Sequence, residues 1–208
     1  MANCFRTQIS LGMPTRKKPK RGRVTVLLSG GIDSSTCVAY FLEQGFKVET
    51  VFVSHGQVAN TRELQAAKSV CRYFHVPLRI IRLAQSARKG PGLIIGRNAF
   101  LVCAAVLEAA RNAQIVAIGI HSGTRYRDCT PLFVRQLQSL FDVCTGGSVQ
   151  ISAPFVKWTK RDIWELAIRL KVPLSATYSC ERGLRQPCGK CDSCSDLEIL
   201  RASQNQQD

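Results

Sequence analysis

Apolar runs and amphipathic stretches alternate along the chain after residue 23. Runs rich in Val, Ile and Leu predict buried strands, and apolar residues three or four positions apart predict helices. The expected strands are Val24–Leu28, Lys47–Val53, Leu78–Leu83, Gln114–Ile118 and Val149–Ile151. The expected helices are Asp33–Gln44, Asn60–Phe74, Arg97–Arg111, Pro131–Cys144 and Lys160–Leu170. This alternation predicts an α/β fold, a three-layer, doubly wound parallel sheet with helices on both faces.

Two of the helix starts carry local signals. Thr159 followed by Asp162 forms a capping-box pattern, and Pro131 suits a first helical position. In a doubly wound sheet, ligands bind beyond the carboxyl ends of the strands. The loops expected to build the site follow Leu28, Val53, Leu83 and Ile118.

Length and composition fit one domain with a small appendage. We expect a basic arm at 1–23, an α/β domain at 24–176, a metal-binding segment at 177–202 and a frayed tail at 203–208. No apolar run approaches the roughly 20 residues that cross a bilayer, and the N-terminal residues lack a signal-peptide pattern. Ten cysteines in a chain of this size and patterning indicate reduced thiols and a cytoplasmic protein.

The formal net charge is +15, and residues 14–23 hold six of the 29 basic residues. This stretch shows no apolar periodicity, so we expect a flexible arm. The arm could contact nucleic acid or an acidic protein, or be a solvated leader. Charge alone does not separate these alternatives.

Residues 29–35 read Ser-Gly-Gly-Ile-Asp-Ser-Ser and directly follow the first expected strand. Gly30 and Gly31 allow backbone angles that turn successive amide N–H groups toward an anion. A helix starting near Asp33 adds the positive end of its dipole at the same place. A strand, a glycine turn and a helix in this order predict a pyrophosphate site.

The same segment supplies side chains for phosphate and metal. Ser29, Ser34 and Ser35 offer hydroxyls, while Asp33 could hold Mg²⁺ or orient a phosphate. No lysine follows the glycines, which excludes the Gly-x-x-x-x-Gly-Lys P-loop. The string resembles the PP-loop of ATP pyrophosphatases, which split ATP between the α and β phosphates. This resemblance implies ATP and Mg²⁺ as cofactors.

Four cysteines near the end have the spacing Cys-x₇-Cys-x₂-Cys-x₂-Cys: Cys180, Cys188, Cys191 and Cys194. Four thiolates with no open position describe a structural zinc site, away from substrate. An iron–sulfur cluster could use the same ligands. Such a site would stabilise a short, loop-rich segment without a core of its own.

Several strings together carry a family resemblance. Gly96–Leu101 reads Gly-Arg-Asn-Ala-Phe-Leu, 126–129 reads Tyr-Arg-Asp-Cys, and Thr177–Cys180 leads into the cysteine cluster. With the PP-loop, these strings resemble the 7-cyano-7-deazaguanine synthase (QueC) family, from about Val24 to Leu200.

The resemblance implies an ATP-dependent C–N ligase of queuosine biosynthesis. In that chemistry the acid 7-carboxy-7-deazaguanine attacks the α-phosphate of ATP, and ammonia displaces AMP to give an amide. A second ATP activates the amide oxygen, and loss of AMP leaves the nitrile. A homodimer is also compatible with the resemblance.

The resemblance assigns roles by position. Asp33, Ser34 and Lys160 form the implied catalytic set. The implied phosphate-binding residues are Ser29, Gly30, Gly31, Asp33, Ser34 and Ser35, with Gly56 and Gln57 near the nucleotide. The implied substrate residues are Arg97, Asn98, Tyr126 and Asp128, of which Arg97 pairs with a carboxylate and Asp128 accepts from the guanine-like edge. Surface roles remain open for Arg97 and Lys160, and a catalytic thiol remains open for Cys129.

The chain departs from the family pattern in two loops. The stretch from Leu83 to Gly96 is short. The loop Gly119–Asp128 is also short, and before Asp128 it lacks the acidic residues and the Ser-Gly-Tyr-Pro sequence that are typical of the family. His121, Arg125 and Arg127 stand there instead. Without the family's acidic residues to receive ammonium, the nitrile-forming step stays open, and the trimmed loop would admit a larger amine, such as a protein terminus. Relatives of the family also occur in antiphage-defence gene clusters, where the first half-reaction alone could serve this purpose.

Two other function classes use the same features. A PP-loop tRNA-modifying enzyme, such as a thiolase or lysidine-type ligase, would account for the basic charge. A nucleotide sensor or zinc-stabilised binding module would need no catalysis, although a degenerate PP-loop would suit it better than this complete string.

Overall fold

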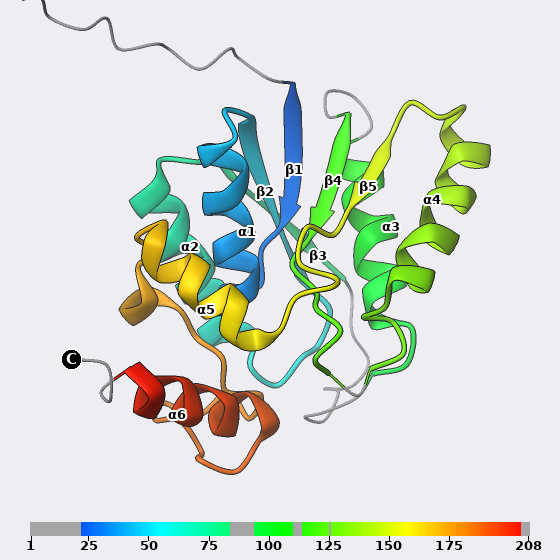
Figure 1. Cartoon of the computed structure of the whole chain (residues 1–208). Coiled ribbons are helices and arrows are strands. Elements are labelled where there is room, and N and C mark those ends of the chain that lie inside the picture. Colours follow the sequence, from blue (N-terminus) through cyan, green and yellow to red (C-terminus); the bar gives the residue numbers. More distant parts are fainter. Residues whose placement is uncertain (1–21, 84–93, 110–113, 125, 205–208) are drawn as a thin grey trace, which may run out of the picture.

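The structure, a computed structural model, describes residues 22–83, 94–109, 114–124 and 126–204. The described strands form one parallel sheet in the order β3-β2-β1-β4-β5 (Figure 1). They are β1 (Arg23–Leu27), β2 (Lys47–Ser54), β3 (Leu78–Arg82), β4 (Ile115–Ile118) and β5 (Gln150–Ser152). This confirms the predicted fold class. Each strand begins and ends within one residue of the position that the sequence predicted.

Helices cover both faces of the sheet. They are α1 (Ile32–Glu43), α2 (Asn60–Phe74), α3 (Arg97–Ala109), α4 (Pro131–Thr145), α5 (Lys160–Arg169) and α6 (Asp192–Gln204), with a 3₁₀ turn at Leu174–Ala176. Helices α1, α2 and α5 pack on one face and α3 and α4 on the other (Figure 1). The predicted end of α3, Arg111, lies outside the described residues, as does the arm at 1–21.

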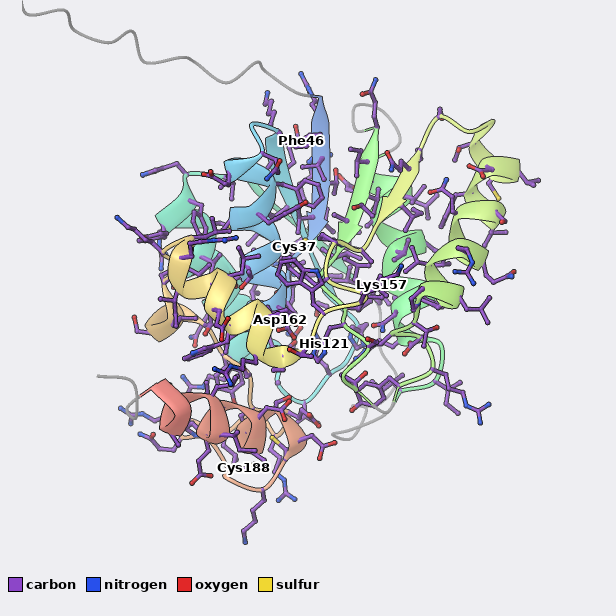
Figure 2. All side chains as sticks on the ribbon, in the orientation of Figure 1. Cys37, Phe46, His121, Lys157, Asp162 and Cys188 are labelled. Atoms are coloured by element: carbon purple, nitrogen blue, oxygen red, sulfur yellow. The ribbon has the colours of Figure 1, made fainter. Side chains whose placement is uncertain are left out.

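The two faces of the sheet have separate cores, which explains the continuous apolar runs of the strands. Along β2, Val51 and Val53 pack with α3 and α4, while Phe52 between them packs with α1 and α2. Figure 2 shows side chains on both sides of the sheet, including the fully buried Cys37 of α1. The central strand β1 is therefore enclosed, and its carboxyl end opens toward the loops.

Helix starts follow the predicted signals. Thr159 and Asp162 form the complete capping box of α5, with the Asp162 carboxylate accepting from the Thr159 backbone N–H at 2.8 Å. Pro131 occupies the first turn of α4, and the Thr130 side chain accepts from the Phe133 N–H. Local capping chemistry thus fixes the positions at which both helices begin.

The segment after residue 176 needs a correction. It was expected to be loop-rich, but its second half is the helix α6. Leu197 and Leu200 of α6 pack with Ile32 of α1 and Trp164 of α5 in a third apolar cluster. This helix has few core-facing residues, so its apolar pattern is weak and it was missed. Residues 203 and 204 end α6, and 205–208 lie outside the described residues.

Among the described helices, none combines the length and apolar character that a membrane span requires.

Candidate active site at the carboxyl edge of the sheet

A cavity of about 530 Å³ lies at the carboxyl edge of the sheet. Three of the loops predicted to build the site line it, namely those after β1, β2 and β4; the loop after β3 falls in residues outside the described ranges. The N-terminus of α3 and the segment around α6 complete the lining. Thus the C-terminal segment covers the site as well as carrying the cysteines.

The PP-loop forms the floor of this cavity. Ser29, Gly31, Asp33 and Ser34 line it. Gly30 instead lies against α2, with φ +83°, and a side-chain carbon there would meet the Glu63 carbonyl oxygen at 2.6 Å. Only glycine fits such a position.

The hydroxyls of the PP-loop hold its backbone. Ser34 Oγ and Ser35 Oγ donate to the Gly31 carbonyl at 3.1 and 2.8 Å, and Ser29 Oγ lies 3.0 Å from Ser34 Oγ. Ser35 is fully buried behind the loop. Of the predicted phosphate residues, Gly30 and Ser35 therefore shape the loop, while the others face the cavity.

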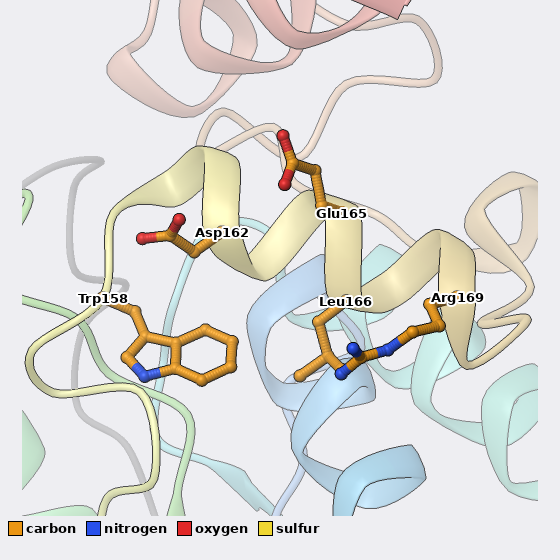
Figure 3. Close-up of a pocket in the computed structure, with 5 residues that line it drawn as sticks. All are labelled: Trp158, Asp162, Glu165, Leu166 and Arg169. Carbon is orange, nitrogen blue, oxygen red and sulfur yellow. The ribbon is translucent and has the colours of Figure 1, made fainter.

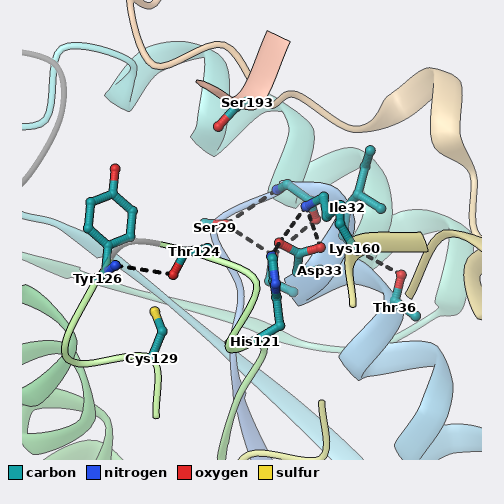
Figure 4. A network of polar contacts seen from close by, with 12 residues as sticks. Ser29, Ile32, Asp33, Thr36, His121, Thr124, Tyr126, Cys129, Lys160 and Ser193 are labelled. Atoms are coloured by element: carbon teal, nitrogen blue, oxygen red, sulfur yellow. Dashed lines mark hydrogen bonds and ion pairs between the residues drawn. The ribbon is translucent and has the colours of Figure 1, made fainter. Parts of the chain in front are cut away.

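Asp33 and Lys160 form an ion pair at the cavity (Figure 4). Lys160 Nζ donates to both oxygens of the Asp33 carboxylate, at 2.6 and 2.7 Å. Asp33 lies in the first turn of α1, not in an exposed loop, and Lys160 is the first residue of α5. The structure thus brings together three predicted catalytic residues, Asp33, Ser34 and Lys160. Because Lys160 occupies both carboxylate oxygens, the geometry favours an orienting role for Asp33.

His121 lies on the other side of Asp33, with Nε2 3.8 Å from Asp33 Oδ2. Its side chain is 5% exposed, and Nδ1 has no hydrogen-bond partner among the described residues. The pKa of His121 is lowered, chiefly by burial and also by the positive charge of Lys160. The negative charges of Asp33 and Asp196 act in the opposite direction and raise it. The imidazole is therefore neutral at pH 7.

Sequence reasoning singled out His121 only as a departure from the family loop. Its neighbour Gly119 fixes the loop against the PP-loop, because a side-chain carbon at 119 would lie 2.8 Å from the Asp33 carbonyl oxygen. The sequence carried one signal for this close approach to the PP-loop: Gly119 directly follows the expected strand that ends at Ile118.

The loop after β2 is organised by Gln57. Its Oε1 accepts from the His55 backbone N–H at 2.9 Å, and its Nε2 donates to Glu63 Oε2 at 3.0 Å. Gln57, His55 and Glu63 line the cavity, and Gly56, with φ +92°, makes the turn between His55 and Gln57. Sequence reasoning placed Gly56 and Gln57 here but missed Glu63.

At the start of α3, Arg97 and Tyr126 line the cavity together, with the Arg97 guanidinium 6.0 Å from the centre of the Tyr126 ring. Asn98 is buried, and its Nδ2 donates to the Asp128 carbonyl at 3.2 Å. The Asp128 carboxylate accepts from the Asn98 backbone N–H at 3.3 Å. Asp128 is not among the cavity-lining residues, so in this structure it caps α3.

Cys129 lines the cavity but is 5% exposed, and Asn98 Nδ2 lies 3.5 Å from its sulfur. Burial raises the pKa of Cys129, so it carries a protonated thiol. This argues against the alternative of a catalytic thiolate.

The four predicted cysteines come together, with their sulfur atoms all within 4.8 Å of one another. Tetrahedral zinc with thiolates separates the sulfurs by about 3.8 Å, and Cys188 Sγ and Cys194 Sγ lie 3.9 Å apart. The Lys190 backbone N–H, at 3.4 Å, contributes most to lowering the pKa of Cys188 to about 6. The donor set therefore fits zinc, or iron with the same thiolates, in a closed site.

The cysteine segment is joined to the PP-loop. The Tyr178 backbone N–H donates to the Gly30 carbonyl at 2.9 Å, and a side-chain carbon at Gly183 would meet the Val58 carbonyl at 2.7 Å. Between the cysteines and the PP-loop, Glu181, Ser193 and Asp196 face the cavity. A metal in the cluster would thereby hold one wall of the site.

A second hollow, of about 500 Å³, lies along the outer side of α5 (Figure 3). Trp158, Asp162, Glu165, Leu166 and Arg169 line it. None of the predicted site residues belongs to it, so the PP-loop cavity is the candidate active site.

Comparisons with known proteins identify relatives of this chain. A family model described as queuosine biosynthesis protein QueC matches residues 23–94 and 91–202. A 7-cyano-7-deazaguanine synthase of Picrophilus torridus is 32% identical over 201 residues, covering 83% of this chain and 84% of that protein. Another, of Prochlorococcus marinus, is 33% identical over 198 residues, covering 81% of this chain and 88% of that protein.

Among solved structures, the NMN synthetase of Francisella tularensis superimposes with a TM-score of 0.51 at 19% identity, covering 90% of this chain and 78% of that chain. This likeness shows a shared fold. The match of the family model and the identity to the curated relatives show that the chain belongs to the QueC family.

Proposed function

We propose that this chain is an ATP-dependent ligase that adenylates the carboxylate of 7-carboxy-7-deazaguanine, aminates it to the amide and then, with a second ATP, forms the nitrile 7-cyano-7-deazaguanine. The observation that carries the proposal is the complete PP-loop on the cavity floor, with Lys160 beside Asp33. Membership of the QueC family supports the substrate.

In the first step, an oxygen of the substrate carboxylate forms a bond to the α-phosphorus of ATP. The bond from that phosphorus to the bridging oxygen breaks, and pyrophosphate leaves with the electron pair. Backbone N–H groups at the start of α1, together with the hydroxyls of Ser29 and Ser34, would bind the phosphates. Lys160 would offset the charge of the leaving pyrophosphate, and Mg²⁺ bound to the phosphates would add positive charge.

In the second step, the amine nitrogen bonds to the acyl carbon, AMP leaves with the electron pair, and the amine loses a proton. Adenylation supplies the leaving group that a bare carboxylate lacks. Arg97 could hold the substrate carboxylate before activation, and the Tyr126 ring beside it could stack on the flat heterocycle. Asn98 and Asp128 would support this wall by fixing the 119–128 loop to α3.

A second candidate is a ligase that stops at the amide, joining the acid to a larger amine such as a protein terminus. The short 119–128 loop favours it, because residues 119–124 line the cavity without a carboxylate to receive ammonium. The carboxylates on the opposite wall come from the cysteine segment, at Glu181, Asp192 and Asp196. Zinc in the cysteine cluster would stabilise that wall and take no part in either step.

Mass spectrometry tests the proposal directly. Purified protein is incubated with Mg-ATP, 7-carboxy-7-deazaguanine and ammonium, with an Asp33→Asn variant as the inactive control. Nitrile with AMP identifies a complete synthase, and amide or acyl-adenylate as the end point supports the second candidate. An absence of both acid-dependent pyrophosphate release and any new product of the acid would contradict both.

A further inference from the structure

Glu63 is a carboxylate in the cavity that the proposed reaction leaves without a role. It lies in the first turn of α2, next to the PP-loop, where it is half-buried and lines the cavity. Among the described residues, its one hydrogen-bond partner is Gln57 Nε2, at 3.0 Å from Oε2. The second oxygen, Oε1, accepts no hydrogen bond within that part of the chain.

The surroundings of Glu63 suit a ligand with N–H donors. Burial raises the pKa of Glu63, while the Gln57 hydrogen bond and the charge of Arg97 oppose the shift. A half-buried carboxylate in a cleft, with one of its oxygens open to a ligand, is a functional-site candidate. Arg97 is near enough for its charge to act on Glu63, so one ligand could reach both residues.

Apart from Asp196 of α6, whose charge acts on His121, the other carboxylates near the cavity are hydrogen-bonded, exposed or outside its lining. Asp33 has both oxygens on Lys160, and Glu181 accepts from the Ser193 hydroxyl at 3.0 Å. Asp192 is exposed at the start of α6. Asp128, the carboxylate expected from sequence to read the guanine-like edge, caps α3 outside the cavity lining.

The guanine-like ring of the acid and the adenine ring of ATP differ in the hydrogen-bonding groups on their edges, and this difference shows which of the two suits Glu63. The edge of a guanine-like ring presents two adjacent donors, N1–H and the 2-amino group, which match the two oxygens of a carboxylate. Adenine presents its 6-amino donor beside the N1 acceptor, whose lone pair would face a carboxylate oxygen. A carboxylate at this position therefore fits the acid substrate better than ATP.

We propose that Glu63 binds the N1–H and 2-amino edge of the 7-deazaguanine acid and sets the specificity for guanine-like substrates. Gln57 positions the Glu63 carboxylate, and Arg97 takes the opposite, carboxylate end of the same molecule. This inference rests on the proposed function, since it names the residue that recognises the proposed substrate.

The test compares two acids on one enzyme. Acid-dependent ATP–pyrophosphate exchange is measured with 7-carboxy-7-deazaguanine and with its 2-desamino analogue, 7-carboxy-7-deazahypoxanthine. The wild-type chain should prefer the guanine form in kcat/KM by about 10- to 100-fold, the range expected for hydrogen bonds to a charged group. In Glu63→Gln this preference should fall toward one, with the KM for ATP unchanged.

Two further variants sharpen the result. Glu165 is an exposed residue of α5 that pairs with Arg161. The variant Glu165→Gln should therefore keep the wild-type preference. Asp128→Asn should also keep it, and a collapse of the preference in Asp128→Asn instead of Glu63→Gln would overturn the inference.

The comparison of the two acids on the wild-type chain tests the inference even if a variant fails to fold. If the wild-type chain adenylates both acids equally well, the inference is wrong while the proposed function stands. If neither acid supports exchange, the proposed function fails first, and the inference fails with it.

Discussion

Asp33 and Lys160 lie 127 positions apart in the chain, yet the lysine bonds both oxygens of the carboxylate. We predict that Lys160→Met lowers ATP-dependent pyrophosphate release by about 100-fold or more, because a charge that stabilises the departing phosphates is lost. The pair is partly exposed, so its contribution to stability is about 1 kcal/mol or less. Arg161→Met, at the next position, is the control for pyrophosphate release. Equal activity in Lys160→Met and the wild type would refute the role of Lys160.

His121 gives a prediction of pH dependence. Its pKa in the folded protein is lowered, chiefly by burial, from 6.5. Below pH 6.5 the unfolded chain takes up a proton at this position that the folded chain refuses, so stability falls as the pH drops from 6.5 toward the lowered value. Above 6.5 this group has no effect on stability.

Thermal melts of the wild type and His121→Gln between pH 5 and 8 check this. The wild type should lose more stability than the variant on acidification. Parallel melting curves across the range would show that residue 121 does not titrate as expected.

At the residue scale, the sequence predicted well where chemistry is local. The PP-loop string and the cysteine spacing are contiguous, and the structure gathers both sets as expected. Sequence reasoning assigned Asp128 to the guanine-like edge and did not single out Glu63. The contacts of a carboxylate depend on which helix end or cavity wall its side chain meets, and the sequence does not show this. In the sequence, a carboxylate near an expected pocket looks the same whether its side chain caps a helix or faces the ligand.

The helix α6 connects stability to the site at the scale of elements. Leu200 is 7% exposed and packs against α1 and α5, while Asp196, one turn earlier, lines the cavity. We predict that Leu200→Ala destabilises the protein by about 2 to 4 kcal/mol, because it leaves a cavity in the third cluster. It should also raise the KM of a substrate, because the cavity wall moves with α6.

Ile199→Ala is the matched control in the same helix, since Ile199 is 65% exposed. Denaturant melts of both variants decide the point. If both cost the same free energy of unfolding, α6 does not pack through Leu200 as described.

Elements with strong periodicity were predictable, and α6 was not. The inner strands β1, β2 and β4 are buried on both faces and their sequences are apolar runs, and the helices between the strands have wide apolar faces. In α6 the sequence offers Leu197 and Leu200 after a stretch of Gly, Pro and Cys that reads as loop. Packing on Trp164 and Ile32 stabilises α6. Both residues lie far from α6 in the sequence, so the local pattern does not show these contacts.

At the scale of the molecule, the cysteine cluster should couple metal content to the whole fold. We predict that Cys191→Ser loses one zinc per chain and lowers the melting temperature, because the ligand set is no longer complete. Cys144→Ser is the control, since Cys144 is exposed on α4, away from the cluster. Elemental analysis with thermal melts gives the answer. Retention of zinc by Cys191→Ser would show the ligand assignment to be wrong, and bound iron would identify the other metal.

The position of the cysteine segment in the chain has a consequence for biosynthesis. The five strands that the structure describes all precede residue 153, but the segment that covers the cavity and donates to the Gly30 carbonyl begins after residue 176. A ribosome therefore releases the sheet and PP-loop before the residues that complete the site. A nascent chain paused between these points would carry an open, uncovered nucleotide pocket. Its maturation would then wait for both the last helix and the supply of metal in the cell.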